Sequence, residues 1–162
     1  MAQQDPILHQ AGVLAYRIRH GAVEVLLLTS RDTGRWLIPK GNIPGRLTPA
    51  QAAEREAFEE AGIKGTIDGN LPMGVYTYFK RLPSGEIRPA AVEVYLLRFR
   101  RQLKKWPEKY ERVIAWVSAA KAINLIEEPG VVPLLVRLQE LEETLCCAAA
   151  TPSGEIQPQL HG

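Results

Sequence analysis

Apolar residues gather in short stretches along the first quarter of the chain, as they do in β-strands. Residues 11–19 and 22–29 are two such stretches, and they are joined at His20-Gly21. A two-residue break that contains glycine is typical of a β-hairpin. Residues 36–38 form a third, shorter stretch that leads to Pro39-Lys40-Gly41. We therefore predict a hairpin followed by a short strand.

The region between residues 48 and 62 has the signals of a helix. Thr48 suits the N-cap, Pro49 suits the first helical position, Gln51 completes a capping box, and Gly62 fits the left-handed position after the helix. One face would carry small side chains that let the helix lie close to a sheet, namely Ala50, Ala53, Ala57 and Ala61.

The second half of the chain continues with strands and ends with helices. We predict strands at residues 75–80, 90–99 and 113–117, and the first two are joined through the turn at 82–85. Ser118 would cap a helix over 118–126, Glu128-Pro129-Gly130 would break the chain, and an amphipathic helix would follow at about 132–145.

This order of elements predicts an α/β fold in which helices cover both faces of a mixed sheet. Residues 1–147 are expected to form one domain, because no linker or internal repeat interrupts them. The polar segment at 148–162 contains proline and glycine and is expected to be a flexible tail.

Composition narrows the functional class. The chain has 162 residues, of which 46% are apolar and 23% charged. Its net charge of +2 is too small for the protein as a whole to attract nucleic acid electrostatically. Its apolar runs are too short for a membrane span, and residues 1–10 lack the pattern of a signal peptide. The adjacent Cys146 and Cys147 suit neither a disulfide framework nor a zinc site. We expect a cytoplasmic protein with no membrane or nucleic-acid partner.

Three carboxylates, Glu56, Glu59 and Glu60, fall on one arc of roughly 100° of the predicted helix. Like charges at i and i+4 weaken a helix by a few tenths of a kcal/mol, so Glu56 and Glu60 need an offsetting interaction. A bound divalent cation would supply it, whereas a solvated acidic face is the simpler alternative. Neither histidine nor cysteine accompanies these glutamates, so the donors favour Mg²⁺, with Mn²⁺ as a substitute.

Residues 41–63 resemble the Nudix box, Gly-x5-Glu-x7-Arg-Glu-U-x-Glu-Glu-x-Gly-U, in which U is a bulky aliphatic residue. The positions that match in register are Gly41, Arg55, Glu56, Glu59, Glu60, Gly62 and Ile63. Two positions depart from the pattern. Leu47 stands where the pattern has its first glutamate, and the small Ala57 stands where it has a bulky aliphatic residue. Flanking segments such as Lys104-Lys105-Trp106-Pro107-Glu108 are similar to the diphosphoinositol-polyphosphate phosphohydrolase branch.

The resemblance covers about residues 8–145 and implies the α/β/α sandwich of that family. It also implies that Glu56 and Glu60 are the principal metal ligands, with Glu59 beside them and the main-chain carbonyl of Lys40 as a third ligand. Glu59 would be the general base or would position the attacking water. Arg55 would pair with the glutamates, although an ordinary helical pair with Glu59 needs no metal.

A phosphorylated substrate needs cations, and several are predicted at the sheet ends beside the box. We assign substrate binding to Arg31, Arg35, Lys40, Gly41, Lys80, Arg81 and Arg88. Each cation taken alone also fits a role in solubility. Glu86 or Glu93 could add a carboxylate from outside the box, and Trp36 or Tyr76 could stack on a base.

These expectations lead to one main hypothesis and two alternatives. The main hypothesis is a Mg²⁺-dependent pyrophosphohydrolase that cleaves a diphosphoinositol polyphosphate or a dinucleoside polyphosphate. The alternatives are hydrolysis of ADP-ribose or another nucleoside diphosphate sugar, and a binding module without turnover, which Leu47 could mark. Processing of RNA 5′ ends is disfavoured by the near-neutral charge. The sequence leaves open whether the protein is a homodimer.

Overall fold

Two long strands, β1 (Leu8–Arg19) and β7 (Ile87–Gln102), lie side by side in parallel at the centre of the fold. The computed structural model describes residues 6–150. Most β1 side chains are buried, because layers of the molecule cover both faces of this strand. The parallel register pairs residues 8–16 with residues 90–98.

Six further strands complete an eight-stranded mixed sheet. β2 (Ala22–Thr29) follows β1 through the turn at His20 and Gly21, where both residues have positive φ. One edge of β2 pairs with β1 and, further along, with β3 (Trp36–Leu37), and its other edge pairs with β8 (Ile114–Ser118). β4 (Lys40–Asn42) pairs with β1, while β5 (Ile63–Ile67) and β6 (Gly74–Arg81) pair with β7.

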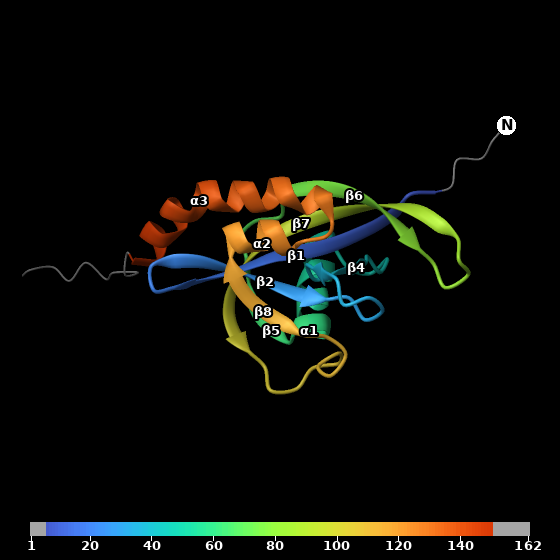
Figure 1. Ribbon diagram of the computed structural model, residues 1–162, viewed down its shortest axis with the longest axis horizontal. Coiled ribbons are helices and arrows are strands. Elements are labelled where there is room, and N and C mark those ends of the chain that lie inside the picture. The colour runs from blue at the N-terminus through green and yellow to red at the C-terminus, as the bar shows by residue number, and fades with distance from the viewer. Residues whose placement is uncertain (1–5, 151–162) are drawn as a thin grey trace, which may run out of the picture.

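Helices lie on both faces of the sheet, as Figure 1 shows. α1 (Pro49–Ala61) packs on one face over a core that includes Val13, Leu26 and Leu97. The other face is covered by α2 (Ala119–Leu125), the 3₁₀ helix η1 (Pro129–Val131) and α3 (Val132–Ala150). Alternating side chains of each strand thus enter two separate cores.

The predicted fold class, hairpin and helix caps are confirmed, and the main errors concern short elements and the C-terminal end. The sequence analysis did not predict β4 or β5. α3 continues to Ala150, so the tail predicted from residue 148 is wrong for residues 148–150, and residues 151–162 lie outside the described part. No helix within residues 6–150 is long and apolar enough to cross a bilayer.

Candidate active site

Helix α1 carries the three glutamates, and its ends are formed by the predicted residues. The side chains of Thr48 and Gln51 each accept a hydrogen bond from the backbone N–H of the other residue, which caps the start of the helix. Gly62 ends the helix in the left-handed conformation. The face turned to the sheet is lined by buried small side chains, which are Ala52, Ala53, Ala57 and Ala61. These alanines let α1 lie close to β1, which fixes the position of the glutamates relative to the sheet.

Glu56 and Glu60 form a hydrogen-bonded carboxyl pair. Burial raises the pKa of Glu60 to about 8; Arg112 opposes this shift and Glu56 adds to it. Burial is also the main cause that raises the pKa of Glu56. Glu60 is buried and Glu56 is half-buried, and two such carboxylates in contact repel each other when both are ionised. A shared proton or a bound cation would relieve this repulsion, which Arg112 already offsets in part.

Glu59 lies apart from this pair. Its side chain is 29% exposed and accepts a hydrogen bond of 2.7 Å from Nε of Arg55. Within residues 6–150, no three side chains of His, Cys, Asp or Glu come close enough together to hold a metal ion by themselves. The structure thus brings together Glu56 and Glu60, whereas the expected convergence of all three glutamates is absent, because Glu59 pairs with Arg55 one turn away.

Strand β4 brings backbone groups against the glutamate pair. A β-carbon on Gly41 would overlap the carboxylate of Glu56, so a larger residue here would push that carboxylate aside. Hydrogen bonds from the Val13 N–H to the Pro39 carbonyl and from the Ile43 N–H to the His9 carbonyl fix the ladder between β4 and β1. In this antiparallel register, the Lys40 carbonyl points away from β1 and is free to bind a cation.

The loop between β7 and β8 adds charged groups that the sequence analysis did not assign to the site. The Glu108 N–H donates to the carbonyl of Glu59, which ties the loop to α1. Arg112 donates to Glu108 at 3.1 Å and to the Thr29 carbonyl at 3.1 Å, and it lies 3.6 Å from a Glu60 oxygen. Arg112 thus holds two carboxylates that would otherwise repel each other.

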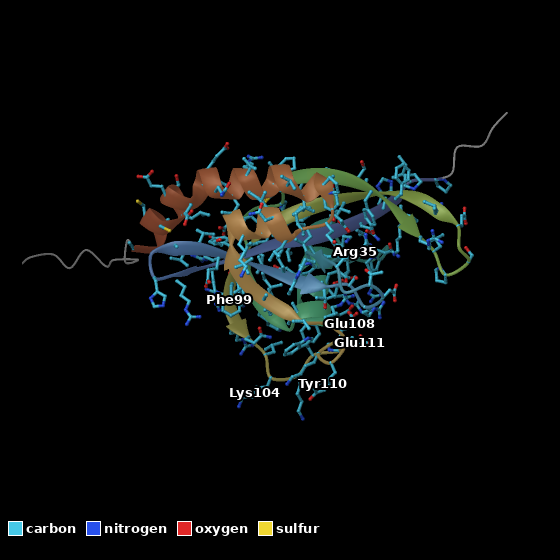
Figure 2. The ribbon with its side chains drawn as sticks, viewed as in Figure 1. Arg35, Phe99, Lys104, Glu108, Tyr110 and Glu111 are labelled. Atoms are coloured by element: carbon cyan, nitrogen blue, oxygen red, sulfur yellow. The ribbon has the colours of Figure 1, made fainter. Side chains whose placement is uncertain are left out.

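A second loop, between β2 and β3, closes against this one. Arg31 lies 3.5 Å from Glu108 and 3.9 Å from Glu111. Figure 2 shows Arg35, Glu108 and Glu111 on the same side of the molecule, where the two loops meet. The loops thereby form one wall of a cavity.

This cavity has a volume of about 700 Å³ and lies between α1, β4, β6 and the two loops. Most of the predicted site residues line it, namely Arg31, Arg35, Lys40, Gly41, Glu56, Glu60, Lys80 and Arg81. Arg88, Arg55 and Glu59 lie outside its lining. Arg88 instead donates a hydrogen bond to the Pro6 carbonyl at 2.9 Å. The cavity therefore has carboxylates at one end and cations along its walls.

Some predicted roles do not agree with the observed positions. Tyr76 is buried in the core and donates to Glu128, so its ring offers no face to a ligand. Trp36 packs against the same core. Glu86 and Glu93 lie outside the cavity lining, which contains Glu108 and Glu128 instead. Only the contacts made in the folded chain distinguish these carboxylates from ordinary surface residues.

The donors at the acidic end suit a hard divalent cation. Glu56 and Glu60 supply carboxylates, Lys40 supplies its main-chain carbonyl, and Glu108 lies close enough to influence both carboxyl pKa values. These are oxygen ligands, which Mg²⁺ prefers, and Mg²⁺ usually takes further ligands from water and substrate phosphates. The residues present therefore fit Mg²⁺ or Mn²⁺.

Comparison with known proteins gives consistent matches. The protein named Nudix hydrolase 16, mitochondrial, from Arabidopsis thaliana is 30% identical over 117 residues, or 70% of this chain and 64% of that protein. The human diphosphoinositol polyphosphate phosphohydrolase 3-beta is 29% identical over 120 residues, which cover 73% of this chain and 68% of that protein. A crystal structure of a C. elegans Ap4A hydrolase binary complex matches with a TM-score of 0.63 and 25% identity, covering 83% of this chain and 97% of that one.

The chain spans about half to two thirds of the length of its Arabidopsis relatives. The family model described as the NUDIX domain matches residues 8–138, which is most of the chain. The chain therefore belongs to the Nudix hydrolase family.

Proposed function

We propose that this protein is a divalent-cation-dependent hydrolase that cleaves a phosphoanhydride bond in a highly phosphorylated small molecule. The observation that carries the proposal is the pair formed by the half-buried Glu56 and the buried Glu60, which faces a cavity lined by cations. Glu56, Glu60 and the Lys40 carbonyl would hold the ion. A bound Mg²⁺ neutralises phosphate oxygens and lowers the pKa of an attacking water.

The cations would bind and orient the polyphosphate. Arg35, Lys80 and Arg81 form no ion pair with any residue that the structure describes, so their charges are available to phosphates. Water attacks phosphorus, the bridging P–O bond breaks, and a carboxylate accepts the proton of the water. Glu59 remains our candidate for this acceptor, and Arg55 positions its carboxylate through their hydrogen bond.

For the substrate, we propose a dinucleoside polyphosphate or a diphosphoinositol polyphosphate. The names of the C. elegans structure and the human relative support one candidate each. Phe79 and Ile87 favour the nucleotide, because they line the cavity and are 78% and 52% exposed. An aromatic ring can stack on a nucleobase, whereas an inositol polyphosphate offers phosphates at its surface.

Two alternatives are tested by the same assays. Hydrolysis of ADP-ribose or another nucleoside diphosphate sugar would use the same carboxylates with fewer phosphate contacts. A binding module without turnover is favoured by Leu47, which packs against the core beneath α1 where the family pattern has a carboxylate. It is also favoured by the position of Glu59 outside the cavity.

The deciding experiment is product analysis by mass after incubation with a dinucleoside polyphosphate, an inositol pyrophosphate and ADP-ribose, each with Mg²⁺ and with chelator. We expect Mg²⁺-dependent cleavage that Glu60→Gln abolishes and that Glu54→Gln, on an exposed position of the same helix, leaves intact. Mg²⁺-dependent binding with no product from any substrate would support the binding module instead.

A further inference from the structure

Glu128 is a buried carboxylate outside the box helix, in the segment between α2 and η1. It is 6% exposed, and one of its oxygens accepts a hydrogen bond of 2.7 Å from Nζ of Lys40. Its other oxygen accepts a hydrogen bond of 2.5 Å from the Tyr76 hydroxyl. A buried carboxylate whose two oxygens both accept hydrogen bonds is held in one position.

A second chain of hydrogen bonds reaches the other end of β4. The Tyr78 hydroxyl donates to Oε1 of Gln10 at 2.7 Å, and Nε2 of Gln10 donates to Oδ1 of Asn42 at 3.1 Å. The Lys40 ammonium also lies 4.9 Å from the centre of the Tyr78 ring. This contact links the hydrogen bonds around Glu128 to those around Gln10. Both Lys40 and Asn42 are therefore anchored by side chains of other elements.

Gly41 lies between these two anchored residues and contacts the site. Neighbouring residues of a strand point to opposite faces, so Gly41 faces Glu56 while Lys40 and Asn42 face the anchors. β4 has only three residues and pairs with β1 alone. Its position relative to Glu56 thus depends on the side-chain anchors as well as on the ladder.

We propose that Glu128 is a positioning residue for the metal site. Through the Lys40 ammonium, it fixes β4 beside helix α1, so that the Lys40 carbonyl and the Glu56 carboxylate could both bind one divalent cation. The proposal rests on the proposed function only in assuming that these two groups hold the ion. It assigns a role to a residue that lies 65 positions beyond Ile63, the last residue of the box.

An ion pair that only stabilised the fold would have a different signature. Loss of either partner would lower the stability, and replacement of both by neutral side chains would restore it. Metal affinity would then recover together with the stability. A positioning role predicts that the two properties separate, because a neutral pair packs well but no longer fixes β4.

The test measures Mn²⁺ binding directly, by the electron paramagnetic resonance signal of free Mn²⁺, in the absence of any substrate. We expect Glu128→Gln to weaken binding about 10-fold or more, the range found for groups that orient metal ligands. Tyr76→Phe, which removes one hydrogen bond and keeps the ring, provides a milder variant if Glu128→Gln fails to fold. Glu140→Gln removes an exposed charge of α3 that lies outside the cavity lining, and it should bind Mn²⁺ as the wild type does.

The double variant Lys40→Met/Glu128→Gln separates the two roles. We expect its melting temperature to return close to that of the wild type while its Mn²⁺ affinity stays low. Recovery of both properties, or unchanged affinity in the folded single variants, would overturn the positioning role while leaving the metal site intact. A wild-type protein that bound no Mn²⁺ would overturn this proposal and the proposed function together.

Discussion

The Glu56 carboxylate occupies the space in which Gly41 would carry a β-carbon. The distance from a β-carbon built on Gly41 to the Glu56 oxygens would be well below 3.0 Å, and β-carbons in proteins essentially never come that close to another heavy atom. Strand β4 and helix α1 are therefore fitted to each other at the point where the cation should bind. The glycine of the box lets the Glu56 carboxylate lie directly against β4, and a side chain at this position would displace it.

Replacing Gly41 by alanine should therefore displace Glu56. We expect Gly41→Ala to reduce Mg²⁺-dependent activity by about 10–100-fold, because the Glu56 carboxylate is pushed aside, and to change stability by less than about 1 kcal/mol, because the end of that side chain can move. Kinetics over a range of Mg²⁺ concentrations, together with thermal unfolding, would measure both effects. Gly45→Ala is the matched control, because a β-carbon there has nothing within 4 Å. Equal behaviour of the two variants would contradict the close fit.

The pH dependence of stability should reveal the buried pair. The pKa of Glu60 is about 8 in the folded protein, against 4.5 as its ordinary value. The contribution of a group whose pKa rises on folding is complete below its unfolded pKa and is lost as the pH rises through its folded pKa. In chelator, the melting temperature should therefore fall between about pH 5 and pH 9. Stabilisation by Mg²⁺ should grow over the same range, and a flat profile would exclude the raised pKa.

Glu60→Gln should separate activity from stability. Activity should fall at least about 100-fold, because even groups that only support a metal ligand typically account for about 10–100-fold. In chelator at alkaline pH, the same variant should melt above the wild type, since the neutral amide avoids burying a charge. Calorimetry of both proteins with and without Mg²⁺ would check this. A variant that melts lower than the wild type under all conditions would disprove the expectation.

Arg112 should be needed for stability as well as for the site. Its guanidinium contacts Glu60, Glu108 and the Thr29 carbonyl, and its removal leaves the buried Glu60 without its cation and Glu108 with Arg31 alone. We expect Arg112→Ala to cost about 3–5 kcal/mol, which denaturant unfolding would measure. Arg101→Ala, at an exposed position of β7, is expected to stay within about 0.5 kcal/mol of the wild type. Similar losses in both variants would mean that the network contributes little.

Phe79 should distinguish the two proposed substrates. If its ring stacks on a base, Phe79→Ala should raise KM for a dinucleoside polyphosphate by about 5–10-fold, equivalent to about 1–1.4 kcal/mol. Hydrolysis of an inositol pyrophosphate should be unaffected. Val75→Ala is a suitable control, because Val75 is exposed on the same strand and lies outside the cavity lining. A uniform change in KM for both substrates would argue against stacking.

Local signals predicted the elements that local interactions form. The hairpin at His20-Gly21 and the caps of α1 follow from neighbouring residues, so the sequence alone identified them. β5 lacked such a signal. It is a five-residue strand that packs closely against β7, where a β-carbon on Gly65 would overlap the Arg98 carbonyl. Its existence depends on a partner more than 30 residues away.

The candidate site divides in the same way. The glutamates of α1 follow from the motif, and the cations at the strand ends follow from the pattern of strands. Glu108, Arg112 and Glu128 become recognisable only when folding places them beside Glu60 and Lys40. In the sequence, Glu128 reads only as part of a break before a helix, because nothing next to it indicates a buried partner 88 positions earlier.

The parallel pairing of β1 with β7 governs when the protein can fold during synthesis. The helix with the glutamates is complete once residue 62 has been added, but the centre of the sheet needs residues up to 98 and the cavity needs residues up to 130. Until then, the edge of nascent β1 that pairs with β7 stays open, and unpaired strand edges favour aggregation. A chain that stops near residue 100 would carry the whole box and still lack an enclosed site.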